Sequence, residues 1–187
     1  MRNLGFMYQW GLGVQVNALI SKRWYGIAAE GSDGAAMRKL GQWYEGHGDG
    51  TKDMKMALHW YNKSAAAGNS AAMCRLAEIH FQDESVTQDR KVAEKWFRKA
   101  AEKGHVSAMN NLGLMLELGT GSERNAHKAS IWYQRAVNEG NFSAMRNLGL
   151  LYEKGNGVQQ DFDQALHLYR LASRGGDKLA MKKLSKL

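Results

Sequence analysis

Apolar and small residues recur along the whole chain with a period of 36 residues. Such a period is typical of an array of helical hairpins, in which each hairpin packs only against its neighbours. We call the residues that share one place in the period a column. Three columns hold only Ala, Met or Leu: Ala36, Ala72, Ala108, Ala144 and Ala180; Met1, Met37, Met73, Met109, Met145 and Met181; and Leu4, Leu40, Leu76, Leu112, Leu148 and Leu184.

Each period is predicted to contain two helices. In the first, the pattern A-M-x-x-L-G-x-x-Y places apolar residues three, four and seven positions apart, on one face of a helix. A glycine inside a helix costs about 1 kcal/mol relative to alanine, so its recurrence predicts a partner helix too close for a side chain. The glycines that follow the Leu column are Gly5, Gly41, Gly113 and Gly149, with Ala77 and Ser185 as small replacements.

Polar residues and glycines mark the helix ends. Side-chain oxygens of Asn and Asp accept hydrogen bonds from the first free backbone N–H groups of a helix, and a glycine commonly ends one. N-caps of the second helix are predicted at Asn17, Asp53, Asp89, Asn125 and Asp161, and N-caps of the next first helix at Asp33, Asn69, His105, Asn141 and Asp177. C-terminal caps are predicted at Gly68, Gly104, Gly140 and Gly176.

An aromatic pair lies in the second helix of most periods. Large aromatic side chains bury about 150–250 Å² each, so one pair per repeat is expected to hold neighbouring hairpins together. The pairs are Trp24-Tyr25, Trp60-Tyr61, Trp96-Phe97 and Trp132-Tyr133, with Leu168-Tyr169 in the last period.

These patterns predict an all-α fold, a right-handed α-solenoid of five antiparallel helix pairs with a C-terminal capping helix. We expect one solenoid domain over residues 1–187. Its repeats are placed at 1–36, 37–72, 73–108, 109–144 and 145–180, and its cap at 181–187.

Composition narrows the function classes. The chain of 187 residues has 21 Gly and no Pro, and 26 Lys and Arg against 18 Asp and Glu give a net charge of +8. This charge permits an acidic partner, but the basic residues are spread over every repeat, as expected of solvated helix faces. Cys74 is the single cysteine, which excludes an intrachain disulfide and a zinc site with paired cysteines.

No segment of the sequence has the pattern of a signal peptide or a membrane span. The first residues, MRNLGFMYQWGLG, lack a continuous apolar core, and no later stretch approaches about 20 apolar residues. We therefore expect a cytoplasmic protein, or a periplasmic or secreted one if a signal peptide has been removed.

The segment NLGLLYEKGNGVQQDFDQALHLYRLASRGGDKLA, residues 147–180, resembles a SEL-one-like repeat, a relative of the tetratricopeptide repeat. Residues 39–72 fit nearly as well, and the resemblance covers essentially the whole chain. It implies a scaffold or adaptor that binds proteins, and some small bacterial relatives are immunity proteins that block a secreted toxin. The family's Gly-x-Gly turn is present at Gly11/Gly13, Gly119/Gly121 and Gly155/Gly157, shifts to Gly48/Gly50, and is missing at Asp83-Glu84-Ser85, where we expect a different turn.

By resemblance to tetratricopeptide arrays, the first helix of each pair is expected to line a concave groove. Basic and amide side chains there suit the carboxylates or backbone of an extended peptide, and exposed apolar ones suit its anchors. The alternative is that the polar ones are solvated or bond neighbouring helices. The predicted partner-binding residues are Arg2, Phe6, Arg38, Gln42, Arg75, Phe81, Asn111, Leu114, Arg146, Asn147 and Leu150.

The sequence holds none of the common catalytic, metal-binding or phosphate-binding motifs. We therefore predict a protein that is not an enzyme, has no catalytic residue and takes no metal or cofactor. The leading hypothesis is a non-catalytic protein–protein interaction module. Two alternatives stay open: an immunity protein that neutralises a toxin, and an RNA-binding helical repeat, although aromatic residues confined to core columns disfavour nucleic acid.

The first helix has an apolar surface where a terminal repeat normally has a polar one. Leu4, Phe6, Met7, Tyr8 and Trp10 all lie in it. This uncapped N-terminal helix predicts a homo-oligomer or an end-on partner.

Overall fold

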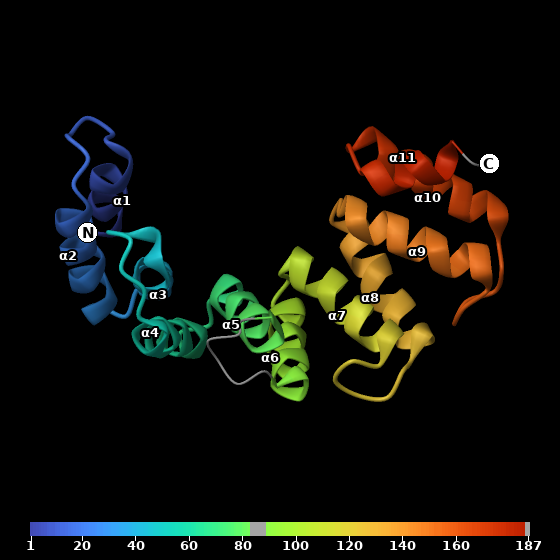
Figure 1. Cartoon of the computed structure of the whole chain (residues 1–187), viewed down its shortest axis with the longest axis horizontal. Coiled ribbons are helices and arrows are strands. Elements are labelled where there is room, and N and C mark those ends of the chain that lie inside the picture. The colour runs from blue at the N-terminus through green and yellow to red at the C-terminus, as the bar shows by residue number, and fades with distance from the viewer. Residues whose placement is uncertain (83–88, 186–187) are drawn as a thin grey trace. The chain divides into compact units, whose positions relative to one another are not determined.

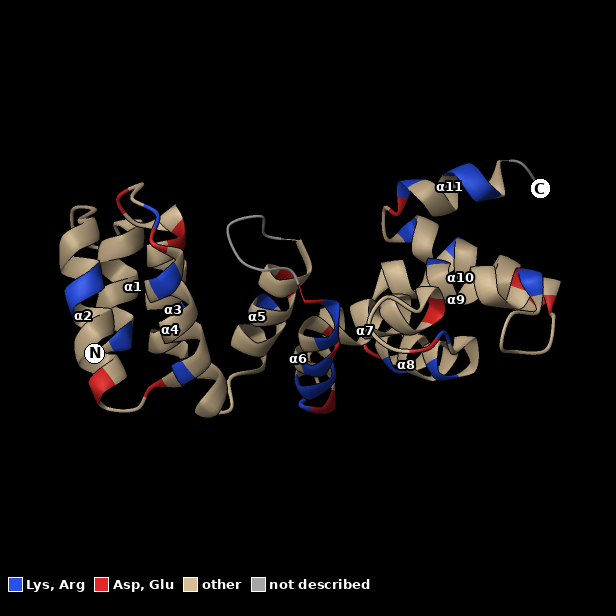
Figure 2. Cartoon of the chain, turned by 60° about the horizontal axis from the view of Figure 1, so that its bottom comes forward, with Lys and Arg blue, Asp and Glu red and all other residues tan. Residues whose placement is uncertain are grey.

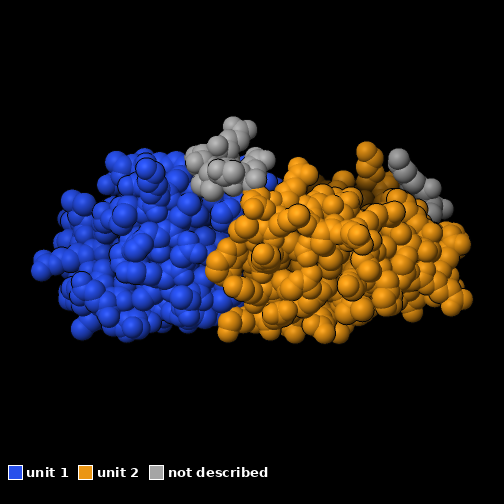
Figure 3. All heavy atoms as spheres, turned by 90° about the horizontal axis from the view of Figure 1, so that it is seen from below, with its two compact units in different colours: residues 1–88 blue, residues 89–187 orange. Residues whose placement is uncertain are grey.

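A computed structural model describes residues 1–82 and 89–185. Within these residues the chain is all-α, with eleven α-helices in sequential antiparallel pairs and one short π-helical turn. Its contacts fall into two compact units, Met1–Gln88 and Asp89–Leu187, which Figure 3 colours separately.

The first unit contains two complete hairpins and the helix that follows them (Figure 1). Each helix packs against the next one along the chain. The first hairpin is α1 (Arg2–Trp10) and α2 (Ala18–Glu30); the second is α3 (Gly34–Gln42), the π-helical turn η1 (Trp43–His47) and α4 (Met54–Ala66); then comes α5 (Ser70–Gln82).

The second unit begins with a single helix and ends with a short one. Between them lie two hairpins, and consecutive helices again pack against each other. The order is α6 (Arg90–Glu102), α7 (Val106–Leu118) with α8 (Ala126–Asn138), α9 (Phe142–Lys154) with α10 (Phe162–Arg174), and α11 (Lys178–Leu184). The predicted all-α class and its helix pairs are confirmed.

The predicted caps are confirmed in both columns. Asn17, for example, accepts from the Ile20 N–H at 3.0 Å, and His105 accepts through Nδ1 from the Ala108 N–H at 3.3 Å. The remaining N-caps also accept from backbone N–H groups two or three residues ahead. The C-terminal glycines have φ between 81° and 86°, and in the first repeat Ser32 holds the same column with φ 63°.

The periodic glycine of the first helix lies under a tyrosine ring, as predicted. A Cβ built on Gly41 would stand 2.6 Å from Cε1 of Tyr61, and one on Gly113 would stand 2.6 Å from Cε1 of Tyr133. Real Cβ atoms do not approach other atoms this closely, so at these two positions a glycine lets the helices meet without displacing the ring. The tyrosine ring and the glycine together set the distance between the helices of a hairpin.

The two aromatic columns have different environments. The tyrosines are fully buried, whereas the tryptophans are half-buried, and a cation three residues further along the helix covers the indole of Trp60, Trp96 and Trp132. Lys99 lies 4.5 Å from the Trp96 ring centroid and Arg135 lies 4.6 Å from that of Trp132. The tyrosine is therefore the core residue of the pair, and the tryptophan is shared between core and surface.

The turns inside the hairpins differ between repeats. In the first, fourth and fifth repeats the first helix ends at a left-handed glycine, Gly11, Gly119 or Gly155. The second repeat has η1 instead, with Gly46 at φ 103°, and the Asp53 N–H still reaches the Tyr44 carbonyl at 2.8 Å. The turn predicted to differ in the third repeat, at 83–85, lies outside the described residues.

Candidate partner-binding surface

The predicted partner-binding residues all lie on first helices of hairpins, divided between the two units. Of this set, Phe6 and Leu114 are exposed apolar side chains, while Phe81 and Leu150 are half-buried. The concave groove that these residues were expected to share stays a prediction. The first unit holds Arg2, Phe6, Arg38, Gln42, Arg75 and Phe81, and the second holds Asn111, Leu114, Arg146, Asn147 and Leu150.

Two of the predicted arginines bond the next repeat. The guanidinium of Arg146 donates to Asp177 Oδ2 at 2.7 Å, and that of Arg2 donates to Asp33 Oδ1 at 3.3 Å. Both acceptors are N-caps of the following first helix, 31 residues further along the chain. These arginines therefore fasten one hairpin to the next, which is the alternative that the sequence had left open.

Asparagine side chains make a second contact between repeats in the second unit. Asn147 is buried and donates through Nδ2 to Asn110 Oδ1 at 3.0 Å. Its own Oδ1 accepts from Arg146 at 3.1 Å, and Asn111 accepts from Asn110 at 3.3 Å. Asn111, Arg146 and Asn147 are thus brought together, in a network that is already satisfied internally.

A hydrogen bond from each buried tyrosine joins the second helix to the C-terminal end of the first helix of the hairpin. The Tyr61 hydroxyl donates to Glu45 Oε2 at 2.5 Å and the Tyr133 hydroxyl donates to Glu117 Oε2 at 2.8 Å. Burial raises the pKa of both tyrosines, and the neighbouring carboxylate raises it further. The phenol therefore stays protonated and serves as a permanent donor.

The tyrosine–carboxylate pair can be recognised in the sequence by the repeat that lacks both of its members. The partners lie 16 residues apart, and in the third repeat Phe81 replaces the acid while Phe97 replaces the tyrosine. Both polar groups are lost together, which avoids leaving a buried hydroxyl or carboxylate unpaired. From the sequence, the Tyr column was expected in the core and the acid column, with Phe81, in the groove; the hydrogen bond between the two columns was not predicted.

In two repeats, the carboxylate that accepts from the tyrosine also pairs with a cation 30 residues further along the chain. Arg75 donates through Nη2 to Glu45 Oε1 at 2.5 Å and bridges to Glu78 at 2.9 Å. Lys183 Nζ lies 2.8 Å and 2.9 Å from the two oxygens of Glu153, which also accepts from the Tyr169 hydroxyl. In the first repeat the same columns hold Gln9, Tyr25 and Lys39. There the Tyr25 hydroxyl donates to the amide oxygen of Gln9 at 2.8 Å.

The hairpin α1/α2 carries exposed apolar side chains around its turn. Trp10 is 60% exposed, Leu12 51%, Val16 61% and Leu19 68%. The same columns in later repeats are mostly polar: Leu19 corresponds to Lys55, Lys91, His127 and Asp163, and Val16 to Lys52, Gln88, Arg124 and Gln160. We call these four side chains the apolar turn of the first hairpin.

Comparison with known families decides the class of the chain. The sequence profile of the Sel1 repeat matches residues 1–33, 34–69, 70–105, 106–141 and 142–177, which is nearly the whole chain. The chain belongs to the Sel1 repeat family. Each matched Sel1 repeat after the first begins at the first residue of a helix, namely α3, α5, α7 or α9.

Solved Sel1 repeat structures share this fold. A Sel1 repeat protein from Oxalobacter formigenes is 30% identical, with a TM-score of 0.89 over 99% of this chain and 76% of that one. The protein c5321, a protective antigen of uropathogenic Escherichia coli with an SLR fold, is also 30% identical, with a TM-score of 0.90. The match covers 96% of this chain and only 38% of c5321, so the chain spans well under half of that relative.

A more distant likeness concerns fold alone. The immunity protein Pa5087 from Pseudomonas aeruginosa is 22% identical, with a TM-score of 0.54 over 86% of this chain and 59% of that one. Compared with curated proteins, the chain has no significant match.

Within residues 1–82 and 89–185, no cluster of His, Cys, Asp and Glu has an arrangement that could hold a metal ion. Among the same residues no helix is long and apolar enough to cross a membrane.

Cys74 is buried, and burial together with the adjacent Glu78 raises the pKa of its thiol to about 12, which leaves it a poor nucleophile.

Proposed function

We propose that this Sel1 repeat chain is a non-catalytic protein-binding module whose first hairpin takes part in contacting the partner. The observation that carries the proposal is the apolar turn, Trp10, Leu12, Val16 and Leu19. Exposed apolar side chains in contiguous groups mark protein interfaces, and here they replace residues that are mostly polar in the later repeats.

The polar side chains of the first helices supply the scaffold of this module. Arg2, Arg75 and Arg146 are engaged by carboxylates of the chain itself, so they position one repeat on the next. Arg38 and Gln42 are half-buried on α3 and are better placed to meet a partner. Substituting Arg146 would weaken the fold and is therefore a poor test of binding.

The proposal is tested by capture from the native source followed by quantitative mass spectrometry. The wild-type chain is compared with the double variant Val16→Arg and Leu19→Lys, which restores residue types found in later repeats. A specific partner should be depleted at least tenfold on the variant. The matched control is Leu118→Lys, a lysine placed on an exposed apolar side chain of the second unit. A partner that binds all three chains equally would contradict the use of the first hairpin.

A second copy of the chain is one possible partner, and light scattering separates that case. A dimer that dissociates in the Val16→Arg, Leu19→Lys variant would identify self-association through the apolar turn. A monomeric mass at high concentration removes the homo-oligomer and leaves an end-on partner of another sequence.

Neither alternative function has a specific observation in its favour. The immunity protein shares only the fold, and toxin neutralisation would itself be a form of protein binding detected by the same capture. Basic side chains lie along α6 in Figure 2, but cations already cover the rings of Trp60, Trp96 and Trp132 at 4.5–5.0 Å. Those faces are therefore not free to stack on RNA bases.

A further inference from the structure

The first unit contains a pocket between its first two hairpins, with a volume of about 380 Å³. Its wall combines polar side chains of α1 and α3, namely Gln9, Lys39 and Gln42, with the indole of Trp43 from η1. Trp10 and Val16 of the apolar turn form the other side. The residues that line the pocket include a lysine and no Asp or Glu, so its charge is unbalanced toward positive.

Lys39 occupies the cation column of the repeat without the carboxylate that the column binds elsewhere. Arg75 is held by Glu45 and Lys183 by Glu153, each 30 residues earlier, but 30 residues before Lys39 stands Gln9. The amide oxygen of Gln9 satisfies the Tyr25 hydroxyl yet carries no charge. Burial, with Arg38 nearby, lowers the pKa of Lys39, as expected of an ammonium that has lost water and gained no anion.

Trp43 adds a second donor that lacks an acceptor. Only 6% of Trp43 is exposed, and its Nε1 has no hydrogen-bond partner among the described residues. The same column holds Met7, Ile79, Met115 and Leu151 in the other repeats, none of which brings a buried N–H. Trp43 lines the pocket, and an unpaired buried N–H costs about 1–3 kcal/mol, so an acceptor that reached Nε1 would gain from satisfying it.

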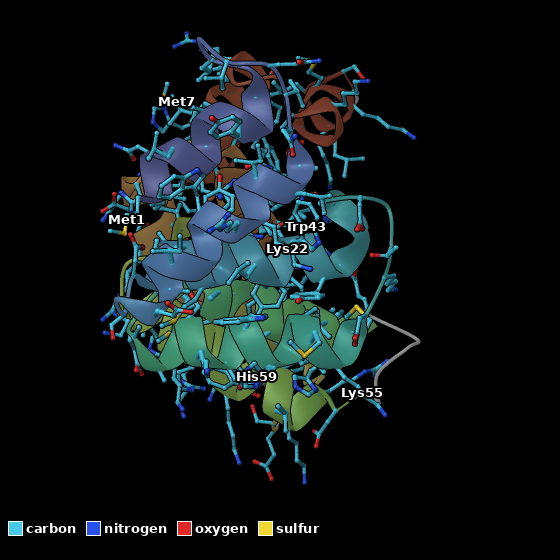
Figure 4. All side chains as sticks on the ribbon, turned by 90° about the vertical axis from the view of Figure 1, so that its left-hand side faces the viewer. Met1, Met7, Lys22, Trp43, Lys55 and His59 are labelled. Atoms are coloured by element: carbon cyan, nitrogen blue, oxygen red, sulfur yellow. The ribbon has the colours of Figure 1, made fainter. Side chains whose placement is uncertain are left out.

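The surroundings reinforce the preference for an anion. Lys22 Nζ lies 5.4 Å from the Trp43 ring centroid and 4.6 Å from that of Tyr44, and Figure 4 labels Lys22 and Trp43 at this end of the first unit. The ammonium of Lys22 adds positive charge beside the indole. Trp10 and Val16, both about 60% exposed, give the pocket an apolar rim.

We propose that this pocket binds a glutamate side chain of a protein partner, with an apolar residue next to the glutamate packed on Trp10 and Val16. The glutamate gives Lys39 the negative partner that Glu45 gives Arg75 and Glu153 gives Lys183. The inference rests on the proposed protein-binding function and names the chemistry of one contact within it.

Two capped peptides of identical length test the proposal. Ac-Ala-Glu-Leu-Ala-NH₂ carries the glutamate and the apolar neighbour, and Ac-Ala-Gln-Leu-Ala-NH₂ differs only in charge. Titration of the full chain at pH 7.5 and low salt, followed by NMR, should show the glutamate peptide binding at least about tenfold more tightly, with shifts at the Trp43 indole N–H. Equal affinities, or no binding of either peptide at millimolar concentration, would overturn the proposal.

A substitution in the chain itself gives the sharper control. Gln9→Glu supplies the missing carboxylate from within, as in the second and fifth repeats, and should abolish peptide binding while keeping the fold. The matched control Gln15→Glu adds the same charge at an exposed position in the turn that follows α1, and it should bind as the wild type does. Lys39→Met should also lose binding. Undiminished binding by Gln9→Glu contradicts the proposal.

The two levels of the hypothesis fail in different ways. If the captured partner is lost with Val16→Arg and Leu19→Lys but retained by Gln9→Glu, the first hairpin binds a protein and the glutamate contact is wrong. If no partner depends on the apolar turn, the proposed function itself falls.

Discussion

The first and last hairpins use the same three columns with different results. In the last hairpin the Glu153 carboxylate accepts from the Tyr169 hydroxyl and from Lys183 Nζ, so this carboxylate and this ammonium are paired within the chain. In the first hairpin Gln9 accepts from Tyr25, and Lys39 lines a pocket that has no carboxylate. The comparison shows how one amide in place of one carboxylate turns a structural ion pair into a candidate binding site.

The largest loss of stability is expected from substituting the periodic glycine, which the first and last hairpins share. Gly149→Ala places a Cβ 2.9 Å from Cε1 of Tyr169, and Gly5→Ala places one 2.8 Å from Tyr25 Cδ1. Because the ring is buried and cannot retreat, each variant should lose about 1–3 kcal/mol of unfolding free energy in urea. If only Gly149→Ala destabilises, the first hairpin does not pack like the others.

Gly26 provides the matched control for these glycines. It lies inside α2, and a Cβ built on it meets nothing within 4 Å. Gly26→Ala should therefore stabilise the chain by about 0.5–1 kcal/mol through helix propensity alone. A loss of stability at this position would undermine the steric explanation at Gly5 and Gly149.

The next largest loss of stability is expected where the tyrosine, the carboxylate and the cation are all present. Glu45 is 5% exposed and accepts from both Tyr61 and Arg75. Glu45→Ala therefore leaves the buried Tyr61 hydroxyl without its acceptor and leaves Arg75 with Glu78 as its remaining carboxylate. We expect a loss of about 2–3 kcal/mol, measured by urea unfolding. Gln9→Ala removes one hydrogen bond and no ion pair, and should cost about 1 kcal/mol. Equal losses would mean that the carboxylate adds nothing to the closed arrangement.

A smaller difference concerns the helix ends. Ser32 adopts φ 63° in the first hairpin, where later repeats have a glycine such as Gly68 at φ 85°. Ser32→Gly should raise the stability by about 0.5–1 kcal/mol, and Gly68→Ser should lower it by about 1 kcal/mol, because a Cβ is strained in this conformation. Thermal unfolding of the two variants measures both changes, and shifts of the same sign would contradict the explanation.

Local and periodic features of this fold could be predicted from the sequence. Caps such as Asn17 and Asp33 act on N–H groups two or three residues away, and Gly41 signals a close neighbour through its period, so both can be inferred without coordinates. The arrangement of polar contacts between repeats was harder to infer. Arg146 was interpreted as a groove residue because its bond to Asp177 spans 31 residues and depends on how two hairpins pack.

The pocket escaped prediction for a related reason. It exists because Gln9 replaces an acid, because η1 replaces the regular turn at Trp43–His47, and because an indole replaces an aliphatic side chain at Trp43. Each departure can be seen in the sequence, but only the fold shows that all three meet. The parts of the site that deviate from the repeat are thus the parts that periodicity cannot place.

The smallest expected effect is a pH dependence of stability that comes from Glu153 in the last hairpin. Hydrogen bonds from Lys183 and Tyr169 lower the pKa of Glu153 below that of an unfolded glutamate. Its contribution is therefore fully present above the unfolded pKa and is lost as the pH falls through the folded one. Between pH 6 and pH 3, Glu153→Gln should lose less stability than the wild type, by about 0.5–1 kcal/mol for this partly exposed pair. Parallel curves would show that the pair contributes no stability.

The pKa of the Lys39 ammonium, measured by NMR titration of its side chain in the wild type and in Gln9→Glu, tests the central comparison most directly. The missing carboxylate predicts a value below that of an ordinary lysine in the wild type and a clear rise in Gln9→Glu, where Lys39 gains the partner that Lys183 already has. An unchanged pKa would contradict the claim that the first hairpin lacks only this carboxylate.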